Sequence, residues 1–531
     1  MKSARSLRTF GLAFVAVVAA TPARADTYPR QPIDALHYAF EITFAEDFAY
    51  TATARLHVRM RGEATSFWLD LDGPTVDAVA VNGRSLGFRH SGGRLALDLD
   101  RAYGSGEIVP VEVSYHGRPG EKGLLAGANA HGRRVLFAEN WPDEARRWLP
   151  SVDHPSDKAG VDFAVTAPDR FDVVAPGRLV ETRSLLDGRR LTRWSEAAPI
   201  PTYCMVIAVA EFDVAHTGAT DGVPLSVWAY PPDAEAAARK LRRSGLMLEF
   251  FADLVAPFPY AKLAQVESPG GFGGMENAGA IFYAEKTLED ASREEVVAHE
   301  IAHQWWGDSV TPADWDDLWL SEGFATYFEG LFYEHLGGRA ALRARMTERA
   351  ERIRKHLAQK PGAVVDPALV DPRAKLNEIT YSKGSWVLHM LRRRLGDEVF
   401  FRGLREYYRT HAGGNTTTED LQRAMEASSG VPLGGFFGQW LQRPDLPELR
   451  VEWAWDERAA EVVLDVEQVQ SGEAYAVPVE LAFQVAEGVE RRTVELGHRR
   501  QRFTLRLPGR PEGLQVDPDT WLLHTATVSP R

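Results

Sequence analysis

The 531-residue sequence has little of three things that mark particular protein classes: cysteine, excess positive charge and long apolar runs. Cys204 is the only cysteine, so an intrachain disulfide and a zinc site built from cysteines are both excluded. Acidic residues outnumber Lys and Arg by 74 to 61, which makes nucleic acid a poor partner. No apolar stretch reaches about 18 residues, so we expect no stable membrane anchor. Any metal must therefore be held by His, Asp or Glu.

The first 25 residues have the pattern of a cleaved export signal. Lys2, Arg5 and Arg8 precede an apolar run over residues 10–20, and an A-x-A exit follows at residues 23–25. We therefore interpret residues 1–25 as a signal peptide that is cleaved near Ala25. The protein is expected to be exported, to the periplasm or the medium depending on the host.

Hydrophobic periodicity divides the rest of the chain into three parts. Residues 26–205 contain period-two stretches, which predict a β-rich N-terminal domain. In residues 206–445 apolar side chains recur mainly at helical spacing, which predicts a mostly helical domain. Short alternating runs return over residues 446–531, interpreted as a small β-sandwich. We find no heptad pattern, so the oligomeric state is left open.

The segment VVAHEIAHQWW, residues 296–306, places two histidines four residues apart around a glutamate. On a helix, His299 and His303 share one face and Glu300 flanks them, which is a spacing typical of metal ligands beside a general base. Two core histidines would give the same pattern. Such a match arises by chance in a chain of this length at a rate on the order of a few per cent.

A third ligand is expected from the next apolar helix. Catalytic zinc sites commonly combine two histidines with one carboxylate and leave a fourth position for water. Glu322 lies near the start of that helix, 19 residues after His303. Glu329, two turns further on, is placed either to accept a hydrogen bond from a ligand histidine or to be an ordinary surface acid.

Three local features concern the ends and faces of these helices. Ser292 and Glu295 have the spacing of a capping box, which is expected to start the helix with the histidines. Gly337 and Gly338 are expected to end the helix with Glu322. The arginine-rich segment 339–360 is interpreted as a solvated helix face rather than a binding surface.

Upstream, the segment GGFGGMENAGA, residues 270–280, surrounds one charged residue, Glu276, with five glycines. Glycine lets a backbone approach another group closely, so the segment predicts a close contact around Glu276. An ordinary glycine turn with an incidental acid is the alternative.

Three motifs in order give a specific resemblance. GGMEN at 273–277, HEIAH at 299–303 followed by Glu322, and ITYSKG at 379–384 resemble the gluzincin aminopeptidases, the family of aminopeptidase N and leukotriene A hydrolase. The resemblance implies a multidomain α+β fold with a saddle-like N-terminal β domain, a thermolysin-like catalytic domain and a small C-terminal β-sandwich. Many relatives continue into a large helical C-terminal domain, and we expect that domain to be missing here.

The resemblance implies a reaction as well. One Zn²⁺ per chain, held by His299, His303 and Glu322, would activate water, with Glu300 as general base and Tyr381 facing the developing oxyanion. We therefore predict a zinc-dependent aminopeptidase acting on peptides with a free N-terminus. The family uses the glycine-rich segment to bind substrate, and the matching residues here are Glu276, which would grip the α-ammonium, with Gly273, Gly274, Met275 and Asn277.

One position departs from the family pattern. A second acid or amide usually precedes the Pro-containing loop, and an ungapped match places Trp141 there. Trp141 has no charge to bind the substrate amine. If the loop is shifted, Glu139, Asp143 or Glu144 would supply the second anchor instead. Two other functions remain open: an epoxide hydrolase of the same family, and a peptide-binding protein that has lost turnover. The preferred N-terminal residue and the peptide length are not decided by the sequence.

Overall fold

The structure, a computed structural model, describes residues 28–290 and 293–531. The predicted export signal and Ser292 therefore lie outside the described residues. Residues Gln31–Arg531 form one compact unit. Among the described residues, no helix has both the length and the hydrophobicity that are needed to cross a bilayer.

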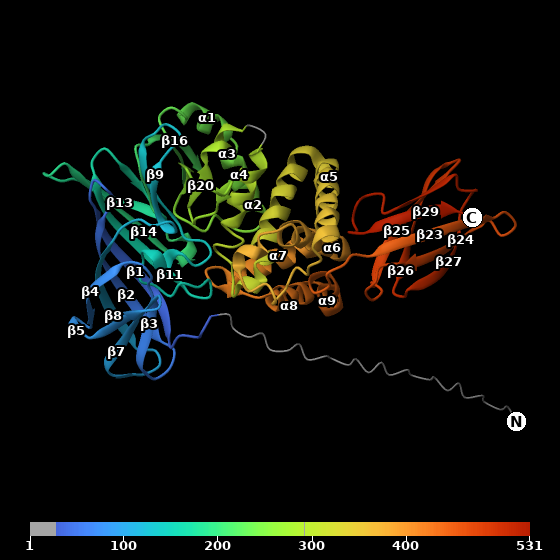
Figure 1. The fold of residues 1–531 in the computed structure, drawn as a ribbon. Helices are drawn as coiled ribbons and strands as arrows, with labels where there is room; N and C mark the ends of the chain where they lie inside the picture. The colour runs from blue at the N-terminus through green and yellow to red at the C-terminus, as the bar shows by residue number, and fades with distance from the viewer. Residues whose placement is uncertain (1–27, 291–292) are drawn as a thin grey trace, which may run out of the picture. The chain divides into compact units, whose positions relative to one another are not determined.

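The N-terminal part is rich in strands, as predicted (Figure 1). Its largest sheet has eight strands in the order β13-β14-β11-β1-β2-β8-β4-β5, and burial alternates strictly along β2, as its period-two sequence requires. The eight strands are β1 (Ile33–Phe44), β2 (Tyr50–Met60), β4 (Thr75–Val81), β5 (Arg84–Leu86), β8 (Ile108–Gly117), β11 (Lys158–Pro168), β13 (Arg178–Ser184) and β14 (Arg189–Pro201).

Two smaller sheets accompany it, in the orders β3-β7-β6 and β12-β15-β10-β9. Asn82 and Gly83 both have positive φ, 50° and 74°, and form the tight hairpin turn between β4 and β5. The strands of the smaller sheets are β3 (Ala64–Asp70), β6 (Phe88–Ser91), β7 (Arg94–Tyr103), β9 (Gly123–Ala128), β10 (Arg134–Glu139), β12 (Asp172–Val174) and β15 (Ala208–Ala210).

A five-stranded sheet in the order β16-β17-β18-β20-β19 opens the middle part. Strand β18 runs parallel to both β17 and β20, whereas the short β19 pairs antiparallel with β20 and forms an edge of the sheet. The strands are β16 (Asp213–Thr220), β17 (Val223–Ala229), β18 (Leu263–Ser268), β19 (Gly274–Met275) and β20 (Ala280–Ala284).

Helices dominate the remainder of the middle part, as the periodicity predicted. They are α1 (Ala234–Lys240), α2 (Ser244–Leu254), α3 (Glu285–Glu289), α4 (Glu294–His303), α5 (Trp319–Gln359), α6 (Gly384–Leu395), α7 (Asp397–His411), α8 (Thr418–Ser429) and α9 (Gly434–Leu441), with a π-helical turn, η6 (Ile379–Lys383), before α6. A short parallel pair joins β21 (Thr311–Pro312) to β22 (Asn415–Thr416).

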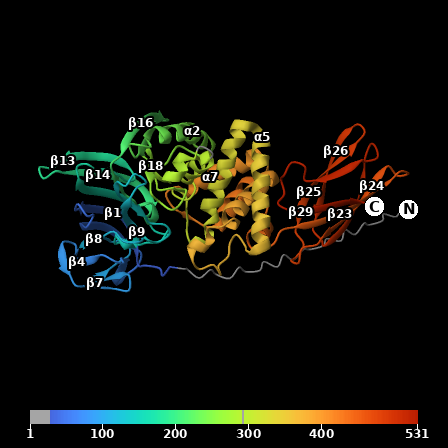
Figure 2. The same ribbon diagram turned by 45° about the horizontal axis from the view of Figure 1, so that its top comes forward.

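Helix α5 is in fact two helices joined at a break. Gly338 has φ 70° and ψ −175°, which no helix accommodates, so the first helix ends at the predicted glycine pair. The two halves of α5 then run side by side in Figures 1 and 2. A contact confirms this arrangement: a Cβ at Gly330 would lie 3.1 Å from the side chain of Leu342.

The capping box predicted for the start of α4 includes Ser292, which lies outside the described residues. The helix begins at Glu294, Arg293 occupies the N-cap position, and its side chain makes no capping hydrogen bond. The acids in the first turn, Glu294 and Glu295, interact favourably with the helix dipole instead.

The C-terminal part has two sheets of strands, ordered β27-β24-β23-β29 and β26-β25-β28. His389 of α6 joins it to the helices: its Nε2 lies 3.0 Å from the carbonyl oxygen of Thr520, and its ring stacks on Trp521. The strands are β23 (Glu448–Asp456), β24 (Glu461–Gln468), β25 (Val477–Val485), β26 (Gly488–Leu496), β27 (Arg500–Arg506), β28 (Gly513–Val516) and β29 (Thr525–Pro530).

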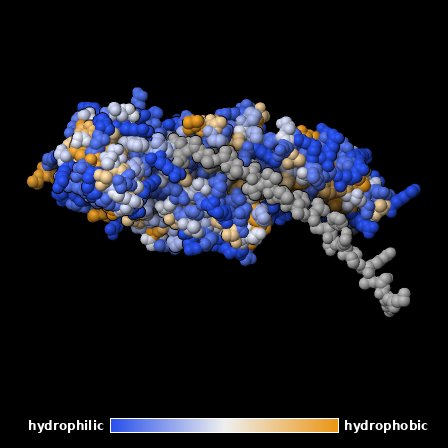
Figure 3. All heavy atoms as spheres, turned by 90° about the horizontal axis from the view of Figure 1, so that it is seen from below, coloured by the Kyte–Doolittle hydropathy of each residue, from blue (hydrophilic) through white to orange (hydrophobic). Residues whose placement is uncertain are grey.

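One buried lysine fastens the N-terminal sheet to the helical part. The ammonium of Lys158, on β11, donates to the carbonyl oxygens of Asp308 at 2.8 Å, Ser309 at 2.7 Å and Gly414 at 3.3 Å. Burial lowers the pKa of Lys158 to about 7, although Asp308 opposes the shift. On the face drawn in Figure 3, hydrophobic residues form small separate groups, because the large aromatic side chains are in the core.

Candidate active site

The structure brings His299, His303 and Glu322 together. The Nε2 atoms of the two histidines lie 3.0 Å apart, and an Oε2 of Glu322 lies 3.2 Å from His299 and 3.3 Å from His303. Ligand atoms about 2.0–2.2 Å from a tetrahedral zinc ion are roughly 3.3 Å from one another, which matches this triangle. These residues therefore fit a divalent zinc ion.

The orientation of His303 strengthens that fit. Its Nδ1 donates to the carbonyl oxygen of Trp306 at 2.9 Å, and because a carbonyl only accepts, the proton of the neutral ring sits on Nδ1. The Nε2 lone pair then points at the triangle, as a metal ligand requires. Ser321, directly before Glu322, also lies 3.1 Å from Nδ1 through its hydroxyl.

The charges around the triangle call for a cation. Burial alone would lower the pKa of His303, but the carboxylates of Glu276 and Glu322 raise it well above its usual value. Conversely, the pKa of Glu322 is lowered despite burial, because His303 and His299 stabilise its charged form. A bound divalent cation would satisfy the same three carboxylate and imidazole groups.

Glu300 and Glu276 lie beside the triangle. Each offers a carboxylate oxygen within 4.8 Å of the other and of a ring nitrogen of His303. Burial, with the neighbouring carboxylate adding to it, raises the pKa of Glu300 well above its usual value. Gly274 explains part of the glycine-rich segment, because a Cβ there would overlap the side chain of Glu300.

Tyr381 approaches the triangle from η6. Its ring stacks on His299 with centroids 5.9 Å apart, and burial followed by the charge of Glu322 raises its pKa well above the usual value. Two glycines allow the approach, since a Cβ at Gly323 would lie 3.0 Å from the backbone of Gly384. The close contact brings the turn with Tyr381 against the helix with Glu322.

These groups share one cavity of about 780 Å³. The three predicted ligands, Glu300 and Tyr381 line it, and so do four members of the glycine-rich segment: Gly273, Gly274, Met275 and Glu276. Asn277 is not among the lining residues. It is 1% exposed, and its side-chain amide has no hydrogen-bond partner within the described part of the chain.

Gln304 is a positioning residue that the sequence did not single out. Its amide nitrogen donates to the carbonyl oxygen of Glu276 at 2.6 Å, and its amide oxygen accepts from the backbone N–H of Gly279 at 2.7 Å. Gln304 therefore fixes the glycine-rich segment against the end of α4. A fully buried amide directly after the histidine motif was the signal that would have identified it.

Trp141 lines the cavity, as expected. Its ring packs edge-on against Phe272 and Trp315, so it forms a wall and offers no carboxylate. Of the three acids considered as substitutes, Glu144 accepts from Lys122 at 2.9 Å, Arg147 at 2.9 Å and Arg373 at 2.7 Å. These three cations lower its pKa although burial opposes the shift, so Glu144 is occupied elsewhere.

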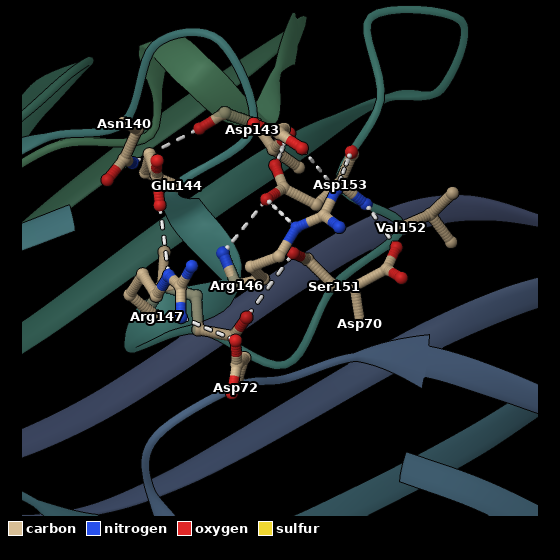
Figure 4. A network of polar contacts seen from close by, with 12 residues as sticks. Asp70, Asp72, Asn140, Asp143, Glu144, Arg146, Arg147, Ser151, Val152 and Asp153 are labelled. Atoms are coloured by element: carbon tan, nitrogen blue, oxygen red, sulfur yellow. Dashed lines mark hydrogen bonds and ion pairs between the residues drawn. The ribbon is translucent and has the colours of Figure 1, made fainter. Parts of the chain in front are cut away.

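Figure 4 shows how the loop that follows Trp141 is held. Arg146 reaches Asp153 with its Nε at 3.0 Å, and Arg147 pairs with both Glu144 and Asp72. Asp143 is half-exposed and lies 3.3 Å from Arg146. The network fixes the loop next to Trp141, the residue of this segment that lines the cavity.

Glu139 differs from the other two acids. It is partly buried at the end of β10 and borders a small space next to Phe272, Gly274 and Met275. Burial raises its pKa, and the distant charge of Arg373 only partly opposes this. Glu139 is thus a carboxylate beside the glycine-rich segment that has no ion-pair partner among the described residues.

Neither alternative for Glu329 holds, and the interpretation of the arginine-rich segment holds only in part. Glu329 does not bind a ligand histidine: its oxygens accept from Arg345 and Arg349, each at 2.8 Å. The arginine-rich segment is also not simply a solvated face, because Arg349 is 2% exposed and Arg345 lines the cavity. The break at Gly338 folds this segment back onto Glu329, a contact that helical periodicity does not reveal.

Comparison with known proteins agrees with the geometry. The sequence matches the Peptidase M1 N-terminal domain over residues 36–204 and the Peptidase family M1 domain over residues 240–440. The glutamyl aminopeptidase of Sus scrofa is 27% identical over 459 residues, which cover 79% of this chain and 48% of the relative.

Two further relatives come from a plant and an archaeon. Aminopeptidase M1 of Arabidopsis thaliana is 31% identical over 370 residues, covering 64% of this chain and 42% of the relative. Probable aminopeptidase 2 of Sulfurisphaera tokodaii is 27% identical over 410 residues, which cover 72% of this chain and 50% of the relative. The chain spans about half the length of the curated relatives it matches. With both domain types matched in order, the chain belongs to peptidase family M1.

Proposed function

We propose that the protein is a zinc-dependent aminopeptidase that removes the N-terminal residue of peptides. The observation that carries this proposal is the convergence, in one cavity, of a zinc-fitting triangle with two further buried carboxylates, Glu276 and Glu300. Its relatives in the family are named aminopeptidases, which supports the same activity.

The proposed roles follow from position. When bound by His299, His303 and Glu322, a zinc ion would polarise the scissile carbonyl and acidify a water molecule. Glu300, as the carboxylate, takes a proton from the attacking water and passes it to the leaving amine. The hydroxyl of Tyr381, kept protonated by its raised pKa, donates to the oxygen that becomes negative.

The amine end is assigned to Glu276. A carboxylate here pairs with a free α-ammonium, and its oxygen within 4.8 Å of a Glu300 oxygen would hold the amine next to the group that transfers the proton. Strand β19 is a sheet edge, so its backbone is available to pair with an extended peptide. We further propose that Glu139 takes the place of the family's second anchor, because Trp141 has no charge and Glu144 is already paired.

The finer architecture remains part of this proposal. We place domain boundaries near residues 205 and 445, with a saddle-like N-terminal domain, a thermolysin-like catalytic domain and a C-terminal β-sandwich. We also propose that the protein is exported after cleavage near Ala25 and that each chain binds one zinc ion. A binding protein without turnover would need neither Glu300 nor Tyr381 in the cavity, and no specific contact favours an epoxide hydrolase.

The experiment is a panel of aminoacyl-coumarin substrates and short peptides assayed with the purified, zinc-loaded protein. We expect cleavage of peptides with free N-termini, loss of activity with a chelator and recovery on adding zinc. Peptides with an acetylated N-terminus should not be cut. Efficient cleavage of acetylated peptides would identify an endopeptidase and contradict the proposal.

A further inference from the structure

The second half of α5 turns arginines into the cavity. Arg345, Arg349 and Arg352 follow one another at i, i+4 and i+7, so they share a helix face, and all three line the same cavity as the zinc-fitting triangle. The proposed aminopeptidase chemistry does not use any of them.

The rise of helix α5 separates these arginines from the amine end of the cavity. Glu276 is within 4.8 Å of His303. Glu329, which holds the arginines, is seven residues beyond Glu322 on the same helix, about 10 Å further along its axis. If Glu276 binds the α-ammonium, the part of the substrate that leaves after cleavage points toward Arg345.

The charge at that end is not balanced among its buried groups. Arg345 and Arg349 share the single carboxylate of Glu329, so these two guanidinium groups and one carboxylate together carry one excess positive charge. Arg349 and Glu329 are almost fully buried, with side-chain exposures of 3% and 9%, so water screens this charge little. Three other acids line the cavity, Glu295, Glu348 and Glu378, and each is partly or fully exposed to solvent, where screening is stronger.

Arg345 is the member that a ligand can reach. Its side chain is 27% exposed, and among the described residues only its Nη1 has an acceptor, Glu329, which leaves the other guanidinium donors for a ligand. The guanidinium also lies over the ring of Tyr333, 3.5 Å from its centroid. The group is therefore held in place before any ligand arrives, which reduces the entropy lost on binding.

We propose that Arg345, backed by Arg349, binds a carboxylate on the leaving part of the substrate. That carboxylate is either the side chain of an acidic second residue or the free C-terminus of a dipeptide. The inference rests on the proposed function, and it adds a substrate class: peptides with a negative charge directly after the residue that is removed. A guanidinium pairs with a carboxylate more strongly than with a neutral amide of the same shape.

The test compares matched substrates. Ala-Glu-amide against Ala-Gln-amide measures the effect of a side-chain carboxylate, and Ala-Ala against Ala-Ala-amide measures that of the C-terminus. We expect the native protein to favour the charged member of at least one pair by about tenfold in kcat/KM. Which pair shows the preference identifies the source of the carboxylate.

Three variants locate the effect. Arg345→Gln should reduce the preference toward one, whereas Glu329→Gln, which removes the competing negative charge, should increase it. A residue with only a structural role would not produce these opposite changes. Arg343→Gln is the control, because Arg343 lies on the same helix but donates to the carbonyl of Pro518 and does not line the cavity. It should leave the preference unchanged.

A binding measurement separates this inference from the proposed activity. Calorimetric titration of the Glu300→Gln variant with the same amides compares their affinities without turnover. A preference for the charged amides supports the carboxylate site even if no peptide is cleaved, in which case only the aminopeptidase proposal fails. Equal affinities and equal kcat/KM values for both pairs would overturn the inference.

Discussion

The carboxylates of Glu276 and Glu300 approach within 4.8 Å of one another, and each lies within the same distance of a ring nitrogen of His303. Two buried acids this close repel: Glu276 adds to the burial that raises the pKa of Glu300, and both carboxylates raise the pKa of His303 against the effect of its burial. Such electrostatic repulsion between two buried acids is kept where each acid has its own chemical role. Here one acid faces the substrate amine in our proposal, and the other handles the proton.

Replacing Glu300 with Gln should remove turnover but leave the zinc triangle intact. We expect kcat to fall by roughly 10²–10⁴-fold, because the amide cannot accept a proton. Zinc content measured by elemental analysis should stay at one per chain, and circular dichroism should be unchanged. Undiminished hydrolysis would refute the assigned role of Glu300.

Replacing Glu276 or Glu139 with Gln tests the amine end. Each change should raise KM for free-amine peptides, because a neutral amide pairs less strongly with an ammonium. The effect of Glu276→Gln should be the larger. Asp143→Asn is a matched control, since this half-exposed acid pairs with Arg146 in the neighbouring loop. If Glu139→Gln behaves like the control, Glu139 is not the second anchor.

Replacing Tyr381 with Phe removes one hydroxyl while the ring stacked on His299 is retained. We expect kcat to fall by about 10²–10³-fold, because the donor acts on charge that develops in the transition state. KM should change little. A rise in KM with kcat unchanged would show that Tyr381 only binds substrate.

His389 predicts a pH dependence of stability far from the catalytic groups. Burial lowers its pKa to about 3 in the folded protein, whereas an unfolded histidine titrates near 6.5. Because the folded pKa is the lower one, its stabilising effect is complete above about pH 6.5 and is lost as the pH falls. From pH 7.5 to 5.0 this group should cost about 2 kcal/mol in the free energy of unfolding.

Urea unfolding of the native protein and of His389→Gln at these two pH values checks this. The variant keeps a donor for the carbonyl of Thr520 but cannot take up a proton, so its stability should fall less on acidification. Parallel losses in the two proteins would show that His389 does not carry the effect.

Local patterns predicted the parts of the molecule that depend on near neighbours. The alternation in β2 and the shared face of His299 and His303 follow from strand and helix periods alone. The role of Arg349 did not follow, because it depends on a contact with Glu329 across the break at Gly338. An arginine that pairs inside a cavity and one that faces water have the same sequence pattern.

The three carbonyls held by Lys158 have a consequence for the evolution of the chain. A gene fission between the N-terminal strands and the helices would separate those carbonyl oxygens from the lysine that donates to them. The two pieces would then have to find each other again as separate polypeptides. Inheritance of both pieces as one reading frame avoids that bimolecular step.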